Sequence, residues 1–216
     1  MSALGTMAQA LEFELTDGVI MRAQRWPAGD RHAVLVHDLD SDLDEVRAIG
    51  QALLSAGFTV TAIDRIGHGM SDDRPAGHAN RSLADDLVDL LGLLALGSGV
   101  YLVGIGEAAA DCLSAAGSIH PSLVALVSPR DVETVDAAVL GTDRSPTLIV
   151  FGAHDPAYET EARRIAAARP GPTVLVRIGT ADQAGVMLGG PSGPQVANHI
   201  VGYARQIAPR PAARGS

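Results

Sequence analysis

The sequence contains no lysine, few aromatic residues and a single cysteine. All 16 basic residues are arginine, which we interpret as the codon bias of a GC-rich bacterial genome. One cysteine, Cys112, excludes an internal disulfide framework, and we expect it to be a small buried apolar residue. Aromatic residues make up only 3% of the chain and hydrophobic ones 47%, so the core must consist mainly of Ala, Val, Leu and Ile.

Positive charge and long apolar runs are scarce as well. The net charge is −9, which argues against nucleic acid or an anionic membrane as the main partner, because both require a basic face. The longest apolar run, around residues 87–97, is too short to span a bilayer. The first residues lack the basic start and apolar core of a signal peptide. We therefore expect a cytoplasmic protein.

Strand-like and helix-like stretches alternate along nearly the whole chain. This alternation predicts one α/β domain over residues 11–207: a mostly parallel, doubly wound sheet with helices on both faces. Asp17-Gly18 predicts a hairpin between the first two strands. Residues 1–10 are predicted to be disordered and residues 208–216 to form a flexible tail. Further strands are expected at 33–38, 59–64, 99–104, 122–129, 147–152 and 173–179, and helices at 42–56, 82–96, from 107, at 131–140, at 158–168 and from 194.

The residues that follow the strands should gather at one edge of this sheet. Open α/β sheets bind ligands beyond the carboxyl ends of their strands. The candidate ligand-binding pocket therefore comprises His37, Asp38, Gly106, Glu107, His154, Asp155, Asp182 and Gln183.

Several of these loops resemble the α/β-hydrolase family. Residues 64–71, DRIGHGMS, are similar to that family's D-x-x-G-x-G-x-S loop, and the resemblance covers residues 11 to 206. It implies that VGIGEA is the turn that carries the nucleophile, which places Gly106 at the serine position. FGAHDP then places Asp155 at the triad acid, and ADQAGVML places Ala184, or Gln183 if the alignment shifts by one, at the histidine position.

The departures from the family pattern concern the chemistry itself. Gly106 has no side chain that could attack a carbonyl, and neither Ala184 nor Gln183 is a general base. Asp38 replaces the glycine of the oxyanion turn, where a carboxylate would repel a developing negative charge. Only Asp155 remains of the implied triad. If this alignment holds, Gly106→Ser combined with Ala184→His is expected to recover weak esterase activity.

Two histidines are candidates for a replacement base. His37 and His154 both follow strands, and Asp38, Asp64 or Asp155 could orient either of them. The competing interpretation makes His37 a structural part of its turn and His154 a solvent-facing loop residue.

The aspartate-rich run HDLDSDLDE lacks the glycine and the glutamate of a calcium loop. We interpret it as a helix start capped by Asp40 or Ser41, and we predict no metal and no cofactor. The segment from Arg130 to Pro146 leaves room for one helix and no lid domain. The pocket is therefore expected to be open and to suit a small-molecule or peptide-like ligand, or to be covered by a protein partner.

Three functional hypotheses follow. The first is a non-catalytic binding or accessory protein on a hydrolase scaffold. The second is an atypical, non-hydrolytic enzyme, such as an epimerase, isomerase, cyclase or lyase, that uses the pocket carboxylates or histidines for proton transfer. The third is a weak hydrolase with a displaced nucleophile, for which Ser128 is the best candidate.

Overall fold

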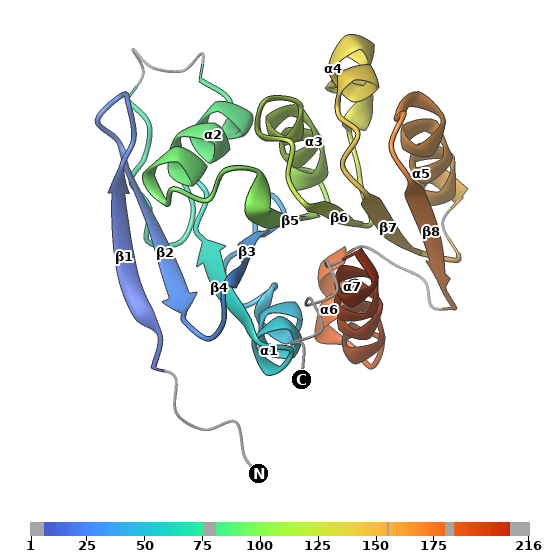
Figure 1. The fold of residues 1–216 in the computed structure, drawn as a ribbon, viewed down its shortest axis with the longest axis horizontal. Coiled ribbons are helices and arrows are strands. Elements are labelled where there is room, and N and C mark those ends of the chain that lie inside the picture. Colours follow the sequence, from blue (N-terminus) through green and yellow to red (C-terminus); the bar gives the residue numbers. More distant parts are fainter. Residues whose placement is uncertain (1–6, 76–80, 155, 180–183, 208–216) are drawn as a thin grey trace, which may run out of the picture.

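The computed structural model of the protein describes residues 7–75, 81–154, 156–179 and 184–207. They form an eight-stranded sheet in the order β1-β2-β4-β3-β5-β6-β7-β8, with helices on both faces (Figure 1). The predicted α/β class is therefore confirmed. The strands are β1 (Gln9–Glu14), β2 (Ile20–Trp26), β3 (Arg31–Val36), β4 (Phe58–Ile63), β5 (Val100–Ile105), β6 (Leu123–Val127), β7 (Thr147–Gly152) and β8 (Thr173–Ile178). The helices are α1 (Arg47–Ser55), α2 (Leu83–Leu93), α3 (Ala108–Ile119), α4 (Ala137–Thr142), α5 (Pro156–Ala168), α6 (Ala184–Gly189) and α7 (Gly193–Ile207).

The first two strands form the predicted hairpin at one edge of the sheet. Gly18 adopts a φ of +80°, a conformation that few residues other than glycine accept. Strand β2 also pairs antiparallel with β4, and all the remaining pairs are parallel. The prediction of disorder over residues 1–10 is wrong at Gln9 and Ala10, because ladder pairing with β2 orders them. The predicted tail over 208–216 lies outside the described residues.

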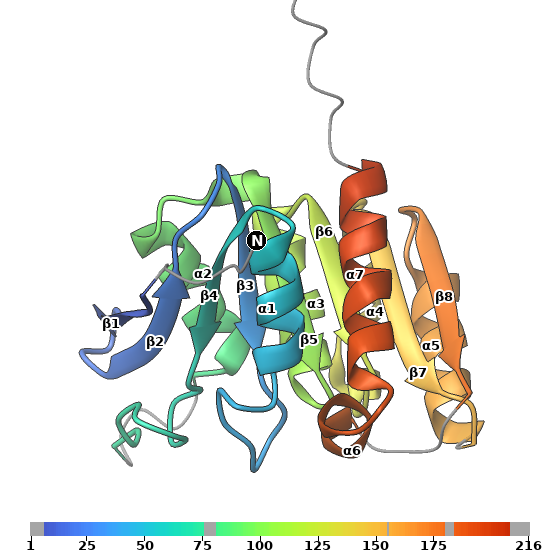
Figure 2. The same ribbon diagram turned by 90° about the horizontal axis from the view of Figure 1, so that it is seen from below.

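The sheet separates two apolar cores. Helices α2, α3, α4 and α5 cover one face, and α1, α6 and α7 cover the other (Figures 1 and 2). The inner strands are buried on both sides, which explains their continuous apolar runs in the sequence. Among the described residues, no helix combines the length and the apolarity that crossing a membrane requires.

The helix boundaries agree with the sequence where capping signals are local. Ser82 caps α2 in a capping box with Asp85, so this helix begins where the sequence predicts it. Gly57 follows α1 with a φ of +83° and ends that helix. The predicted cap of α1 by Asp40 or Ser41 is wrong. Instead α1 begins only at Arg47, after turns over 43–46 and without a side-chain cap.

Two short segments shape the carboxyl edge of the sheet. Between β6 and β7 the chain forms one 3-10 turn and the short helix α4, so the predicted single helix is present and the segment is too short for a lid domain. Helix α6 lies in a region that the sequence predicted to be a loop. This short helix lies at the same edge of the sheet and precedes α7 in the sequence (Figure 2).

Asp64 organises the loop that follows β4. Its carboxylate accepts the Met70 N–H at 3.0 Å, and a Cβ built on Gly69 would lie 2.3 Å from the same carboxylate. Ser71 donates its hydroxyl to the Asp64 carbonyl at 2.7 Å and accepts the Arg22 N–H at 2.8 Å. The residues that the D-x-x-G-x-G-x-S pattern specifies thus hold the loop against β2, and their roles are structural.

His32 makes the fold sensitive to acid. Its ring is 5% exposed and lies 2.8 Å from the Thr61 hydroxyl, and burial, with a smaller contribution from Arg25, lowers its pKa to about 4. The unfolded chain therefore binds a proton that the folded chain rejects between pH 6.5 and about 4. Stability should fall across this window as pH decreases, by on the order of 3 kcal/mol.

We predict that His32→Gln, which stays neutral and can still pair with Thr61, flattens this part of the stability profile. Urea denaturation between pH 7 and pH 4 measures it. The matched control is His154→Gln at an exposed position, which should follow the wild-type profile. Parallel profiles for the His32 variant and the wild type would contradict the assignment.

Candidate ligand-binding site at the β5–α3 turn

A sharp turn connects β5 to α3, and we refer to residues 104–108 as the elbow. Gly106 stands at its apex with a φ of +56°. A Cβ built on Gly104 would lie 2.7 Å from the Cys112 Sγ and 3.0 Å from the Ala108 carbonyl oxygen. Because Gly104 has no side chain, α3 can approach the end of β5 this closely.

The Asp38 carboxylate fills the space in front of the elbow. Its Oδ1 accepts the backbone N–H groups of Leu39 and Glu107, each at 2.8 Å. A Cβ built on Gly106 would lie 2.2 Å from the Cγ and both oxygens of Asp38. Only 7% of the surface of Asp38 is exposed. The carboxylate therefore occupies the position that a side chain on residue 106 would take.

Arg130, from the loop after β6, holds the same carboxylate from the other side. Its Nη2 lies 2.5 Å from the Asp38 Oδ2 and 3.8 Å from the Glu107 Oε1, and its backbone N–H donates to the Gly106 carbonyl at 3.1 Å. Partial burial opposes the charge on this guanidinium, but the Asp38 and Glu107 carboxylates outweigh it and raise the Arg130 pKa. The loops after β3, β5 and β6 are thus joined through one ion pair.

Glu45 supports the backbone of Asp38. Its Oε2 accepts the Asp38 N–H at 2.7 Å. Burial raises the Glu45 pKa; the hydrogen bond from Asp38 opposes this shift, and the neighbouring Asp38 charge adds to it. A Cβ built on Gly185 would lie 3.1 Å from the Glu45 Oε1, so the start of α6 packs against this acid.

His37 is fully buried, and both of its ring nitrogens face the backbone. Nε2 accepts the Arg65 N–H at 3.2 Å, so Nδ1 must carry the proton, which it donates to the Asp38 carbonyl at 2.7 Å. Burial lowers the His37 pKa, so the ring is neutral. The hypothesis that His37 acts as a general base in the pocket is therefore wrong: its role is to join two loops.

A pocket of about 360 Å³ opens beside the elbow, between α2 and α3, and we refer to it as the elbow pocket. It is lined by Arg65, Ser82, Ala84, Glu107, Ala110, Asp111, Ser114 and Asp131. The Nε and Nη1 of Arg65 are buried and have no hydrogen-bond acceptor among the described residues. Burial raises the Asp111 pKa. A guanidinium and several carboxylates that line one polar cavity are suited to bind a ligand that carries both acceptors and donors.

The structure does not bring all the predicted pocket residues together. Asp38, Gly106 and Glu107 meet at the elbow, whereas His154 is exposed after β7. Ala184 is buried as the first residue of α6. The predicted positions Asp155, Asp182 and Gln183 lie outside the described residues.

Three charged residues at the site were not singled out from the sequence: Glu45, Arg65 and Arg130. Arg130 lies three residues after the end of β6 and Arg65 two residues after the end of β4, and a charge near the end of a buried strand needs a partner. That pattern could have indicated both arginines. Glu45 carries no comparable signal, because similar residues occur at many exposed loop positions.

The aspartate-rich run is held by its own backbone and by an arginine. The Asp42 Oδ1 accepts the Asp44 N–H at 2.8 Å, and Asp44 pairs with Arg47. Within the described ranges, no three His, Cys, Asp or Glu side chains are grouped as a metal site would require.

No protein-family model matches the chain, and no curated protein sequence matches it. The chain is similar to several solved structures. A predicted CIB-like hydrolase from Thermoplasma acidophilum has 16% identity, a TM-score of 0.79, and coverage of 94% of this chain and 100% of that one. An esterase domain from Rhodothermus marinus has 19% identity, a TM-score of 0.73, and coverage of 94% and 100%. A bromoperoxidase from Bacillus anthracis has 14% identity, a TM-score of 0.74, and coverage of 92% and 100%.

These similarities establish that the chain has an α/β-hydrolase fold. The three neighbours are described by different activities, although each is similar to this chain over more than nine-tenths of its length. A shared fold at such low identity does not transfer an activity.

The contact between Gly106 and Asp38 generates a prediction. Gly106→Ser should destabilise the protein by about 1–2 kcal/mol through its left-handed φ, whatever its surroundings. The clash with Asp38 should add about 1–3 kcal/mol in the wild type. In an Asp38→Ala background the clashing atoms are gone, so Gly106→Ser should cost only the free energy that its left-handed φ requires.

A double-mutant cycle by urea denaturation measures the coupling between the two positions. Equal costs of Gly106→Ser in both backgrounds would show that the carboxylate does not occupy this space. The same contact revises the expected route to esterase activity, because Gly106→Ser with Ala184→His would still leave Asp38 in the way.

Proposed function

We propose that this α/β-hydrolase-fold protein is a non-catalytic binding or accessory protein and not a working serine hydrolase. The contact of the Asp38 carboxylate with the Leu39 and Glu107 N–H groups carries the proposal. In α/β-hydrolases, the oxyanion hole consists of the N–H of the residue after the nucleophile and an N–H from the loop after an earlier strand. With Gly106 at the nucleophile position, Glu107 and Leu39 supply these groups.

Acyl transfer requires an oxyanion hole whose N–H groups are free, whereas a carboxylate occupies these N–H groups here. Catalysis depends on donors that are free to stabilise negative charge as it develops. Here the donors already bind a carboxylate, which would repel an incoming oxyanion. Gly106 also lacks a nucleophile, and His37 has no free ring nitrogen. Loss of the serine or the histidine of a catalytic triad costs roughly 10⁶ in kcat.

The displaced-nucleophile hypothesis receives little support from Ser128. Ser128 is 0% exposed, so an ester in solvent could not reach its hydroxyl. Ser114 lines the elbow pocket, but its hydroxyl donates to the Ala110 carbonyl at 3.0 Å and no general base is paired with it among the described residues.

The elbow pocket is the ligand site that we propose. Arg65 lines this pocket, and its guanidinium would bind a carbonyl or carboxylate oxygen of the ligand. Glu107 and Asp111 would accept N–H groups of the same ligand. This combination of one cation with several acids suits a small polar molecule or a peptide-like segment.

One observation favours the atypical enzyme as a second candidate. Asp111, with its raised pKa, lines the same pocket as Glu107, and two acids in unlike environments can donate and accept a proton. Exchange of ligand hydrogen for solvent deuterium would distinguish the two. A binding protein causes none, whereas an isomerase or epimerase causes exchange that Asp111→Asn abolishes.

We predict that the wild-type protein hydrolyses p-nitrophenyl acetate no faster than buffer. Asp38→Ala serves as the comparison, because it empties the hole without supplying a nucleophile, and it should be equally inactive. Release of p-nitrophenol measures both. A wild-type rate above the buffer rate, lowered by Asp38→Ala, would refute the proposal.

A ligand site with unsatisfied groups should cost stability when it is empty. We predict that Arg65→Met stabilises the ligand-free protein by about 1 kcal/mol, because two buried nitrogen donors without acceptors, Nε and Nη1, are removed. Arg163→Met is the control, since Arg163 is exposed and paired with Glu159, and it should change stability little. Thermal denaturation measures both. A clear loss of stability on Arg65→Met would indicate a structural role for Arg65 instead.

A further inference from the structure

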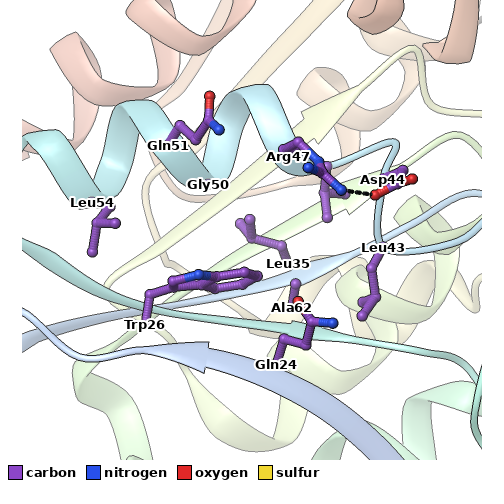
Figure 3. A pocket seen from close by; sticks show the side chains of 11 residues that line it. Gln24, Trp26, Leu35, Leu43, Asp44, Arg47, Gly50, Gln51, Leu54 and Ala62 are labelled. Carbon is purple, nitrogen blue, oxygen red and sulfur yellow. Dashed lines mark hydrogen bonds and ion pairs between the residues drawn. The ribbon is translucent and has the colours of Figure 1, made fainter. Parts of the chain in front are cut away.

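A second pocket, of about 200 Å³, lies on the other face of the sheet, and we refer to it as the tryptophan pocket (Figure 3). It lies between α1 and the strands β2, β3 and β4. Helix α1 covers β3 and β4 on this face, while the hairpin of β1 and β2 extends the sheet beyond the helix (Figure 1). The pocket runs along α1, on the side where the sheet continues beyond the helix.

The interior of the tryptophan pocket is apolar and has one flat wall. Leu35 and Ala62 are 0% and 1% exposed and form its base. The indole of Trp26, the one tryptophan of the chain, lies along the strands and faces the pocket (Figure 3). Leu54 lines it from the helix side. These walls place no charged group in the interior, so it suits a ring that lies against the indole.

Polar groups stand only at the mouth of the pocket. The amide of Gln24, an exposed residue of β2, lies beside the pocket (Figure 3). Arg47 is exposed and is paired with Asp44 (Figure 3). A ligand seated in the pocket could therefore offer a neutral hydrogen-bonding group to the Gln24 amide without separating this ion pair.

We infer that the tryptophan pocket binds a flat, uncharged aromatic molecule of one or two rings with a hydrogen-bonding substituent at one end. The volume sets the size, since an apolar cavity of about 150 Å³ holds a benzene ring. The indole selects for flatness, and the Gln24 amide at the mouth selects for the polar end. This site is separate from the elbow pocket, and the inference does not rest on the proposed function.

Trp26 makes the inference directly measurable, because all tryptophan emission of the protein comes from this pocket. Benzamide is the test ligand, and cyclohexanecarboxamide has the same polar group on a ring that is not flat. Benzamide should change the emission saturably and bind at least about threefold more tightly than cyclohexanecarboxamide. No saturable change, or equal binding of the two amides, would overturn the inference.

Variants test the role of the indole through line broadening of the benzamide signals in NMR. Trp26→Leu should weaken binding by about threefold to tenfold, and Trp26→Phe should restore part of the loss. Glu107→Gln, in the elbow pocket, is the matched control and should leave benzamide binding unchanged. Weakening by Glu107→Gln with no effect of Trp26→Leu would place the ligand in the elbow pocket and refute the assignment.

Discussion

The contact on which the site depends is the Asp38 carboxylate bound to the N–H groups of Leu39 and Glu107 and to the guanidinium of Arg130. It joins the loops that follow β3, β5 and β6, so one short side chain holds these three loops together. A carboxylate that is this nearly buried needs such partners, because an unpaired charge at this depth would be expensive. Glu45 then holds the backbone of Asp38 from behind.

The backbone geometry of this turn suits negative charge. Two N–H groups at a strand-to-helix turn attract negative charge whether it belongs to a reacting ester or to the protein. In acyl transfer the charge develops in the transition state, whereas the Asp38 carboxylate belongs to the folded chain and pairs with Arg130. The absence of a side chain on Gly106 fits this contact, since a Cβ would collide with the carboxylate at 2.2 Å. The residue types at positions 38 and 106 are therefore physically coupled.

The sequence predicts the fold well because the signals are local and periodic. Each signal depends only on residues close in the sequence: examples are the buried run of β5, the cap at Ser82 and the glycine after α1. It also predicts that Asp38, Gly106 and Glu107 share one edge, since strand ends converge there. It does not reveal that Asp38 pairs with Arg130, 92 positions away, or that His37 turns both nitrogens to the backbone. Those contacts depend on side-chain directions that no local pattern encodes. The same holds for the tryptophan pocket, which arises from the extent of α1 relative to the hairpin.

The most direct measurement of the central claim is an NMR comparison of the Leu39 and Glu107 amide protons in the wild type and in Asp38→Ala. If the Asp38 carboxylate accepts both N–H groups, its removal shifts both amide protons upfield, and Asp40→Ala leaves both unchanged. If neither amide proton shifts in Asp38→Ala, this side chain does not bind the two N–H groups and the account of the site is wrong.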